Sequence, residues 1–168
     1  MRIRTALASV FVTASLVATV PAFALELRET KSHFVVDVPD NWLVAAEGNY
    51  AVAYPKDNTF HLRMQGTEHG LSQEAADEEH ALTFLRHHFK DIKVERHAKR
   101  VEWNNFVGIE VFGVGKEKDG SAGKFFLLLL TDKKNAQKGA VVLGTGTVGG
   151  FEKHHPGIYE ALHTMRTY

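Results

Sequence analysis

Short runs that alternate between apolar and polar residues occupy the first third of the chain, and this period of two predicts β-strands. The run 33–38 places a Phe and two Val side chains on one face of a strand. Pro-Asp-Asn at 39–41 predicts a turn, and Trp42 is predicted to plug the corner that follows. Two further strands are predicted over 50–54 and 59–65, the second with apolar side chains at alternate positions.

Two segments have the spacing of an amphipathic helix. The first, 72–90, is predicted to begin after Ser72 as its N-cap, with acidic residues near its start and basic residues near its end, where each sign favours the helix dipole. The second is predicted to begin at about Pro156, because proline suits the first position of a helix. Each segment has an apolar stripe that suits packing on a sheet: Ala75, Leu82, Leu85 and Phe89 in the first, and Ile158, Leu162 and Met165 in the second.

Strand patterns return after the first helix. Alternating apolar residues predict a strand over 107–115, and Asp-Gly at 119–120 predicts a hairpin with a type I′ turn, which needs positive φ at both central residues. The return strand, 124–131, contains six consecutive apolar residues, so it is predicted to be central and covered on both faces. A short apolar strand is predicted at 140–143. One helix on each face would supply the cover, so the predicted fold class is α+β, an antiparallel β-sheet flanked by helices on both faces.

The order of these elements carries a resemblance. Residues 34–42, Phe-Val-Val-Asp-Val-Pro-Asp-Asn-Trp, give an opening strand, a proline turn and a tryptophan. A mid-chain helix, a strand through Gly108, a hairpin and a closing helix with Ile158 and Leu162 follow. This order resembles the PsbP-like superfamily, the α/β/α sandwich of the photosystem II extrinsic protein, of a Ran-binding nuclear import factor and of many small exported bacterial proteins. The resemblance implies binding, assembly or chaperone roles and carries over no catalytic residues.

The first 24 residues are predicted to be a signal peptide. Arg2 and Arg4 form a positive n-region, an apolar stretch follows over 6–20, and Pro-Ala-Phe-Ala at 21–24 ends with the small residues that a signal peptidase site requires. The apolar stretch is shorter than the roughly 20 residues that span a bilayer. An uncleaved amphipathic anchor is the alternative. We expect cleavage before Leu25, a single domain over 25–168 without a membrane span, and a location in the periplasm or outside the cell.

Charge and composition narrow the classes of function. The chain has 20 basic and 20 acidic residues, and loss of the two arginines in the predicted signal peptide would leave a net charge near −2. Chains that bind nucleic acid are usually strongly basic, so no nucleic-acid partner is predicted. The chain has no cysteine, which excludes disulfides, thiol catalysis and thiolate metal sites. Stability must therefore come from packing.

Ten histidines offer the main alternative chemistry, which is zinc or copper binding. His80 and His87 are seven residues apart, about 10.5 Å along a helix, which is too far for one ion. The candidates are His87, His88, His154 and His155. The last two are predicted to precede the final helix, with Glu152 as a candidate partner. The metal-binding spacings H-x-E-H and H-E-x-x-H are absent from the sequence. We therefore assign no metal site from the sequence.

Patterns for catalysis and cofactors are weak. Residues 144–149, Gly-Thr-Gly-Thr-Val-Gly, match a dinucleotide-binding string, which must open a helix inside a βαβ unit. With the last helix predicted from Pro156, the string is interpreted as a strand end where backbones approach closely. The serines of the predicted mature chain, Ser32, Ser72 and Ser121, lie in no nucleophile motif. The acids at 77–79, with Glu26 and Glu29, are interpreted as a solvated face. No cofactor and no catalytic residue are predicted.

These observations favour an exported, non-enzymatic binding or accessory protein of the cell envelope. Its partner is predicted to be another envelope protein or a small ligand, held in a groove between sheet and helix or by loops. Histidine-dependent metal binding is the alternative from another class, and a small hydrolase is a third. The sequence specifies neither the ligand nor the oligomeric state.

Overall fold

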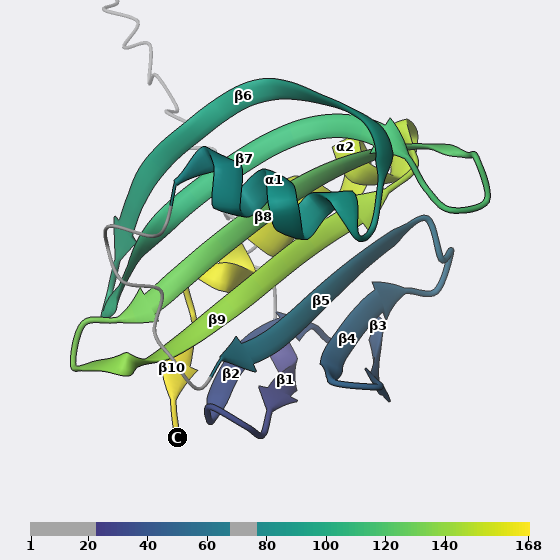
Figure 1. Cartoon of the computed structure of the whole chain (residues 1–168). Coiled ribbons are helices and arrows are strands. Elements are labelled where there is room, and N and C mark those ends of the chain that lie inside the picture. The colour runs from purple at the N-terminus through teal and green to yellow at the C-terminus, as the bar shows by residue number, and fades with distance from the viewer. Residues whose placement is uncertain (1–22, 68–76) are drawn as a thin grey trace, which may run out of the picture.

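The computed structural model describes residues 23–67 and 77–168 of the chain. Figure 1 shows these residues folded as strands around two helices. The strands are β1 (Phe23–Glu29), β2 (Phe34–Pro39), β3 (Trp42–Glu47), β4 (Tyr50–Pro55), β5 (Phe60–Thr67), β6 (Lys90–Trp103), β7 (Phe106–Lys116), β8 (Ala122–Asp132), β9 (Asn135–Gly146) and β10 (Arg166–Thr167). The helices are α1 (Glu78–Arg86) and α2 (Val148–Leu162).

The described strands form two antiparallel sheets. The larger has the order β3-β4-β5-β9-β8-β7-β6, and the smaller has the order β1-β2-β10. The long β6 to β9 strands pair as consecutive hairpins, and β5 returns to pair with β9 over residues 60–67 and 139–146. The predicted α+β class with a mostly antiparallel sheet is confirmed.

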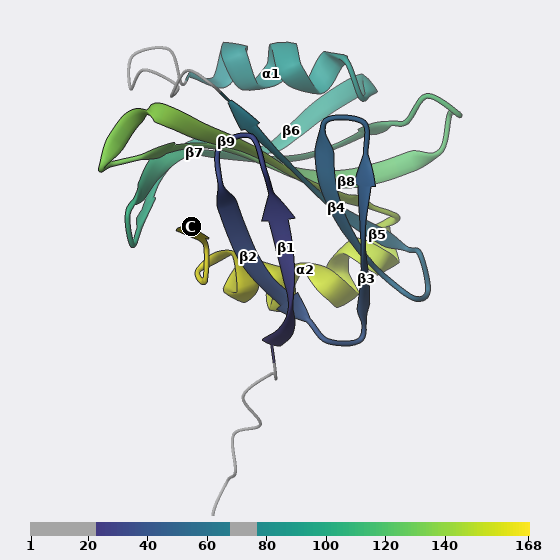
Figure 2. The same ribbon diagram turned by 90° about the horizontal axis from the view of Figure 1, so that it is seen from below.

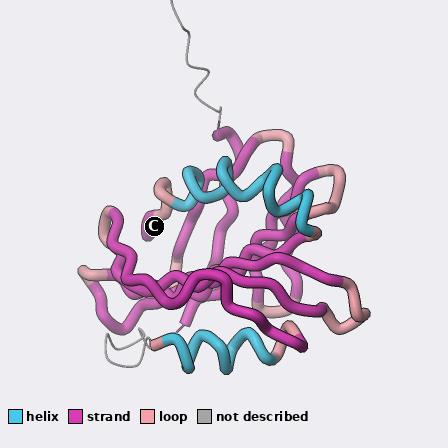
Figure 3. Tube along the Cα trace, turned by 90° about the horizontal axis from the view of Figure 1, so that it is seen from above, coloured by secondary structure: helices cyan, strands magenta, loops and turns pink. Residues whose placement is uncertain are grey.

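Strand β8 is central and buried on both faces, as its apolar run predicts. Its residues 126, 128 and 130 belong to one hydrophobic cluster with α2, whereas residues 125, 127 and 129 belong to a second cluster with α1. Figures 2 and 3 show the two helices on opposite sides of the large sheet. The side with α2 also holds the small sheet, since β2 packs against that helix. The sequence did not predict this second sheet.

The first helix is shorter than predicted. Asp77 has extended backbone angles (φ −106°, ψ 172°), and its carboxylate accepts a hydrogen bond from the His80 backbone N–H at 2.8 Å. This cap makes Glu78 the first helical residue, so a continuous helix over 72–90 is wrong. The predicted N-cap Ser72 lies outside the described residues. The helix ends at Arg86, and Lys90 already belongs to β6.

The second helix begins eight residues before Pro156, which corrects the predicted start. Thr147 is the N-cap, and its hydroxyl accepts a hydrogen bond from the Gly150 backbone N–H at 3.1 Å. Proline lies inside the helix, where it cannot donate the usual bond to the preceding turn. Two glycines and two histidines in the first turns concealed the helical pattern. Gly150 is required there by packing, because a Cβ at this position would overlap the Thr59 carbonyl oxygen of the neighbouring segment.

The predictions for the hairpin at 119–120 and for the corner at Trp42 agree with the structure only in part. The hairpin at 119–120 is present between β7 and β8, but its turn is not type I′. Only Gly120 has a positive φ (89°), and its N–H donates to the Glu117 carbonyl oxygen at 3.0 Å. Trp42 is buried as predicted, but it also begins β3, a strand that the sequence did not predict.

The predicted signal peptide falls almost wholly outside the described residues. Strand β1 begins at Phe23, two residues before the predicted cleavage site, and its pairing with β2 continues from Leu25 to Glu29. Within the described residues, no helix has both the length and the apolar character needed to cross a membrane.

Candidate functional site

Four ring side chains follow one another along α2 at a spacing of four residues. They are Phe151, His155, Tyr159 and His163, and we call them the ring ladder. Successive ring centroids lie 4.9, 5.5 and 5.5 Å apart, and the first two rings are stacked with an interplanar angle of 10°. A spacing of four residues places side chains on one face of a helix. The ladder therefore presents a continuous aromatic stripe to the sheet.

Strands β6 and β7 supply the facing wall. The Trp103 ring lies 6.0 Å from Tyr159 and 4.9 Å from His163, and the Phe112 ring lies 5.2 Å from His155. The Arg96 guanidinium lies over the Phe112 ring at 4.4 Å from its centroid, within the range of a cation–π contact. We call the ring ladder together with Trp103, Phe112, Arg96 and Glu110 the ladder site.

Glu110 is the buried acid of this site. It is 2% exposed, its carboxylate lies 3.7 Å from the Arg96 guanidinium, and the Tyr159 hydroxyl is close enough to affect its pKa. Burial raises the pKa of Glu110 above its usual value, against the opposing effects of Tyr159, Arg96 and Lys99. Burial and the neighbouring carboxylate also raise the pKa of Tyr159 to about 12.

Three buried polar side-chain atoms in the described part of the chain have no hydrogen-bond partner. They are Trp103 Nε1, Glu110 Oε1 and His155 Nε2, and all three belong to the ladder site. Each of these residues contacts Tyr159. Buried polar groups are almost always satisfied in folded proteins, so three unpaired atoms around one tyrosine distinguish this site from the rest of the described core.

A pocket of about 330 Å³ opens beside Phe151 and His155, at the N-terminal end of the ring ladder. Arg96, Phe112 and Lys124 form its sheet side, and Phe151, His155 and Pro156 form its helix side, with Glu95 and Glu152 at the rim. We call it the ladder pocket. Its walls combine aromatic surface with a few polar groups, which is the usual composition of a small-molecule site.

Comparisons with known proteins match at the level of the fold. The PsbP protein of Synechocystis sp. PCC 6803 superposes with a TM-score of 0.62 and 10% identity, over 93% of this chain and 99% of that one. LpqN of Mycobacterium tuberculosis gives 0.62 and 11%, over 80% and 83% of the two chains. The Ran-binding protein Mog1p of Saccharomyces cerevisiae gives 0.56 and 10%, over 85% and 94%. The chain has the PsbP-like fold. No protein-family model matches the sequence, and no curated protein matches it.

The four candidate histidines do not come together in this PsbP-like fold. His87 is the exposed C-cap of α1, and the half-buried His88 lies 5.0 Å from the Phe84 ring. On the other side of the sheet, His154 contacts Asp57 at 3.1 Å, whereas His155 belongs to the ring ladder. Both lie inside α2, so their predicted place before the helix is wrong. The described residues contain no group of three or more His, Asp or Glu side chains placed to hold a metal ion.

The histidine of the ladder pocket favours its neutral form. Burial lowers the pKa of His155, and the positive charges of Arg96 and Lys124 lower it further. The predicted neighbour of these histidines, Glu152, instead forms an ion pair with Lys124 at 3.4 Å. Metal binding through His154 and His155 remains a prediction without a described ligand set.

The glycine string 144–149 does lead from a strand into a helix, which corrects the prediction that the helix begins later. Its strand β9 pairs antiparallel with both neighbours, so the string is not part of a βαβ unit. A Cβ at Gly144 would overlap the Phe126 ring, and one at Gly146 would lie 2.5 Å from the Thr59 carbonyl oxygen. These two glycines are explained by close packing.

The described serines have structural partners. The Ser32 hydroxyl donates to the Thr67 carbonyl oxygen at 3.0 Å, and the Ser121 hydroxyl donates to the Asp119 carboxylate at 2.6 Å. Ser72 lies outside the described residues.

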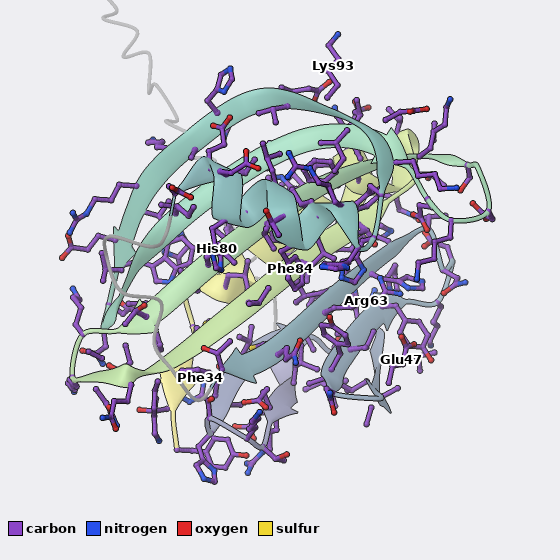
Figure 4. All side chains as sticks on the ribbon, in the orientation of Figure 1. Phe34, Glu47, Arg63, His80, Phe84 and Lys93 are labelled. Atoms are coloured by element: carbon purple, nitrogen blue, oxygen red, sulfur yellow. The ribbon has the colours of Figure 1, made fainter. Side chains whose placement is uncertain are left out.

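A second polar cluster surrounds Arg63 on the side of the sheet that carries α1. Arg63 donates to the Thr145 hydroxyl at 3.2 Å and lies 3.7 Å from the Glu47 carboxylate, and Figure 4 shows it near the end of α1. Its other partner is His61 Nδ1, at 3.2 Å, and His61 Nε2 contacts Asn58 Oδ1 at 2.8 Å. The polar groups of this cluster are hydrogen-bond partners of one another, whereas three polar atoms of the ladder site have no partner.

The sequence carries a signal for the ring ladder that sequence reasoning missed. The pattern F-x3-H-x3-Y-x3-H at 151–163 has the spacing of a helix face. With the helix predicted to begin at Pro156, the first two rings fell outside it. The facing wall has no local signal, because it depends on how β6 pairs with β7.

Replacing Glu110 by glutamine is expected to change how stability depends on pH. Because the folded-state pKa of Glu110 is raised, the folded chain binds more protons than the unfolded chain between pH 4.5 and that raised value. Wild-type stability should therefore fall relative to Glu110→Gln as the pH rises through this window, by at most about 1.4 kcal/mol per pH unit. Urea unfolding of both proteins from pH 4 to 8 measures the difference.

Glu102→Gln is the matched control, since the exposed Glu102 has a pKa lowered by its hydrogen bond to Lys133. That stabilisation is lost only as the pH falls below 4.5, so the Glu102→Gln difference should not change as the pH rises from 5 to 8. A Glu110→Gln difference that is constant with pH would contradict the raised pKa.

Proposed function

We propose that this chain is an exported, non-enzymatic binding or accessory protein of the cell envelope, and that it binds through the ladder site. The observation that carries the proposal is the open pocket beside the ring ladder, which has aromatic walls and two cations, Arg96 and Lys124. A concave site that combines apolar walls with a few polar groups is the usual setting for a small ligand.

Similar folds support the accessory role. LpqN is described as involved in cell envelope biogenesis, and Mog1p is described as a Ran-binding protein. The identities of 10–11% transfer the fold alone. Export is proposed from the signal-peptide pattern of residues 1–24, and we expect the protein recovered from the envelope fraction to begin at Leu25.

Site-specific photocrosslinking in the native cells tests the proposal. A crosslinking residue in place of Glu152, at the rim of the ladder pocket, is expected to form a reproducible adduct. The matched control replaces Glu79, an exposed glutamate on α1 at the opposite side of the sheet. Tyr159→Phe, which keeps the ring and removes the hydroxyl that interacts with Glu110, should lower the adduct yield at 152. Equal yields at 152 and 79, no adduct at 152, or full-length protein retained in the cytoplasm would contradict the proposal.

A further inference from the structure

The wall composition of the ladder pocket restricts the shape of its ligand. Phe112 and Phe151 are buried to more than nine-tenths, and with His155 and Pro156 they give the pocket flat apolar walls. Its volume of about 330 Å³ lies at the small end of the range for ligand pockets, about 300–1,000 Å³. A compact molecule with a flat or apolar body fits, whereas a long chain does not.

The charged groups at the opening favour a negative partner. Arg96 lies over Phe112, and the Lys124 ammonium lies 6.0 Å from the centroid of the Phe151 ring, so both cations sit on the aromatic walls. A cationic ligand would compete with these residues for the same ring faces. Both cations also lower the pKa of His155, which shows that positive potential reaches into the pocket.

Arg96 has unused capacity to bind an anion. Within the described residues, its ion-pair contact is with Glu110 at 3.7 Å, which is longer than a hydrogen bond, and its side chain is 61% exposed. A guanidinium matches a carboxylate with two parallel hydrogen bonds.

The acidic groups around the pocket limit the charge that it accepts. Glu95 and Glu152 lie at the rim. A phosphate monoester carries about 1.5 to 2 negative charges at neutral pH, which these two side chains would repel. A single negative charge balances the attraction of Arg96 and Lys124 with less repulsion.

We propose that the ladder pocket binds a small organic carboxylate, with its apolar or aromatic body against the pocket wall at Phe112, Phe151 and Pro156 and its carboxylate on Arg96 and Lys124. This inference rests on the proposed function, since it names the ligand class of the same site. The carboxylate approaches Arg96 from the open side, where 61% of that side chain is exposed.

Four probes that share a phenyl ring test the ligand class on the purified chain 25–168. Benzoate is expected to bind saturably in calorimetry or NMR titration, with a dissociation constant of about 1 mM for a ligand of this size. Benzyl alcohol, benzylamine and phenyl phosphate should each bind at least about tenfold more weakly, because a change in charge of this kind is worth about 1.4 kcal/mol or more. Equal or tighter binding of any of the three, or no binding of benzoate, overturns the proposal.

Arg96→Gln should weaken benzoate binding at least about tenfold. Lys93→Gln is the matched control, because Lys93 is on the same strand, is exposed and points outward from β6 in Figure 4. Lys124→Gln provides a second loss of charge if the Arg96 variant does not give a cooperative unfolding transition. Equal affinities of Arg96→Gln and Lys93→Gln would overturn the assignment. Crosslinking at 152 without benzoate binding would overturn the ligand class and leave the proposed binding site standing.

Discussion

Replacing Gly108 by alanine is expected to destabilise the chain by about 3 kcal/mol, which lowers the Tm by about 10 °C. Gly108 is in β7, opposite Leu130 of β8. A Cβ at this position would overlap the Leu129 carbonyl oxygen and lie 3.0 Å from the Leu130 Cα. These are backbone atoms of a central strand that is also paired with β9, so no change of rotamer can relieve the overlap.

Gly157→Ala is the control for this prediction. Gly157 is an exposed residue inside α2, and a Cβ there would meet no atom within 4 Å. The same chemical change should therefore stabilise the helix by about 0.5–1 kcal/mol. Thermal and urea unfolding of the three proteins measure the effects. A Gly108→Ala variant as stable as the wild type would show that the pairing of β7 with β8 differs from the one described.

The sheet was the most predictable part of the molecule, because strand periodicity is local. The run 33–38 and the apolar core of β8 each match a described strand, and the double burial of β8 follows from its unbroken apolar sequence. Helix boundaries were less predictable. Asp77 and Thr147 act as caps through single side-chain hydrogen bonds, and other residues nearby could have capped equally well by type alone.

The ladder site could be predicted only in part. The rings of α2 follow a helix spacing that the sequence shows, but the wall opposite them depends on the register of β6. Irregularities in the pairing around Arg96 place it opposite Phe112, and Lys99 opposite Glu110. A bulge shifts which residues share a face, and its position has no clear sequence signal here. Glu110 also has the sequence pattern of an ordinary polar position between apolar strand residues, so its burial was not predictable.

The glycine string gives the second large expected effect, because it separates two explanations of the same residues. If Gly144 is a glycine because the Phe126 ring lies against it, Gly144→Ala should cost about 3 kcal/mol through overpacking. Phe126 is completely buried and its ring contacts those of Phe60 and Phe151, so it cannot move aside. Phe126→Leu alone should cost about 1–2 kcal/mol, since it leaves a small cavity.

The double variant decides between packing and a phosphate-binding role. Leucine removes the ring atoms that the new methyl group would overlap, so the double variant should be more stable than additivity predicts by at least about 1 kcal/mol. Gly108→Ala with Phe126→Leu is the matched control, because the Cβ at Gly108 would meet the Leu129 carbonyl oxygen and the Leu130 Cα, not the side chain of residue 126. Its two effects should add.

Additive free energies of unfolding for Gly144 with Phe126 would contradict the packing explanation. Coupling between Gly144 and Phe126, with additive effects in the control double variant, would mean that position 144 requires glycine because the Phe126 ring leaves no room for a methyl group. A glycine selected to let a phosphate approach the backbone would gain nothing from a smaller side chain on the neighbouring strand. The Phe126 ring also contacts His155 of the ring ladder. It would then lie in contact with both the glycine string and the proposed binding site.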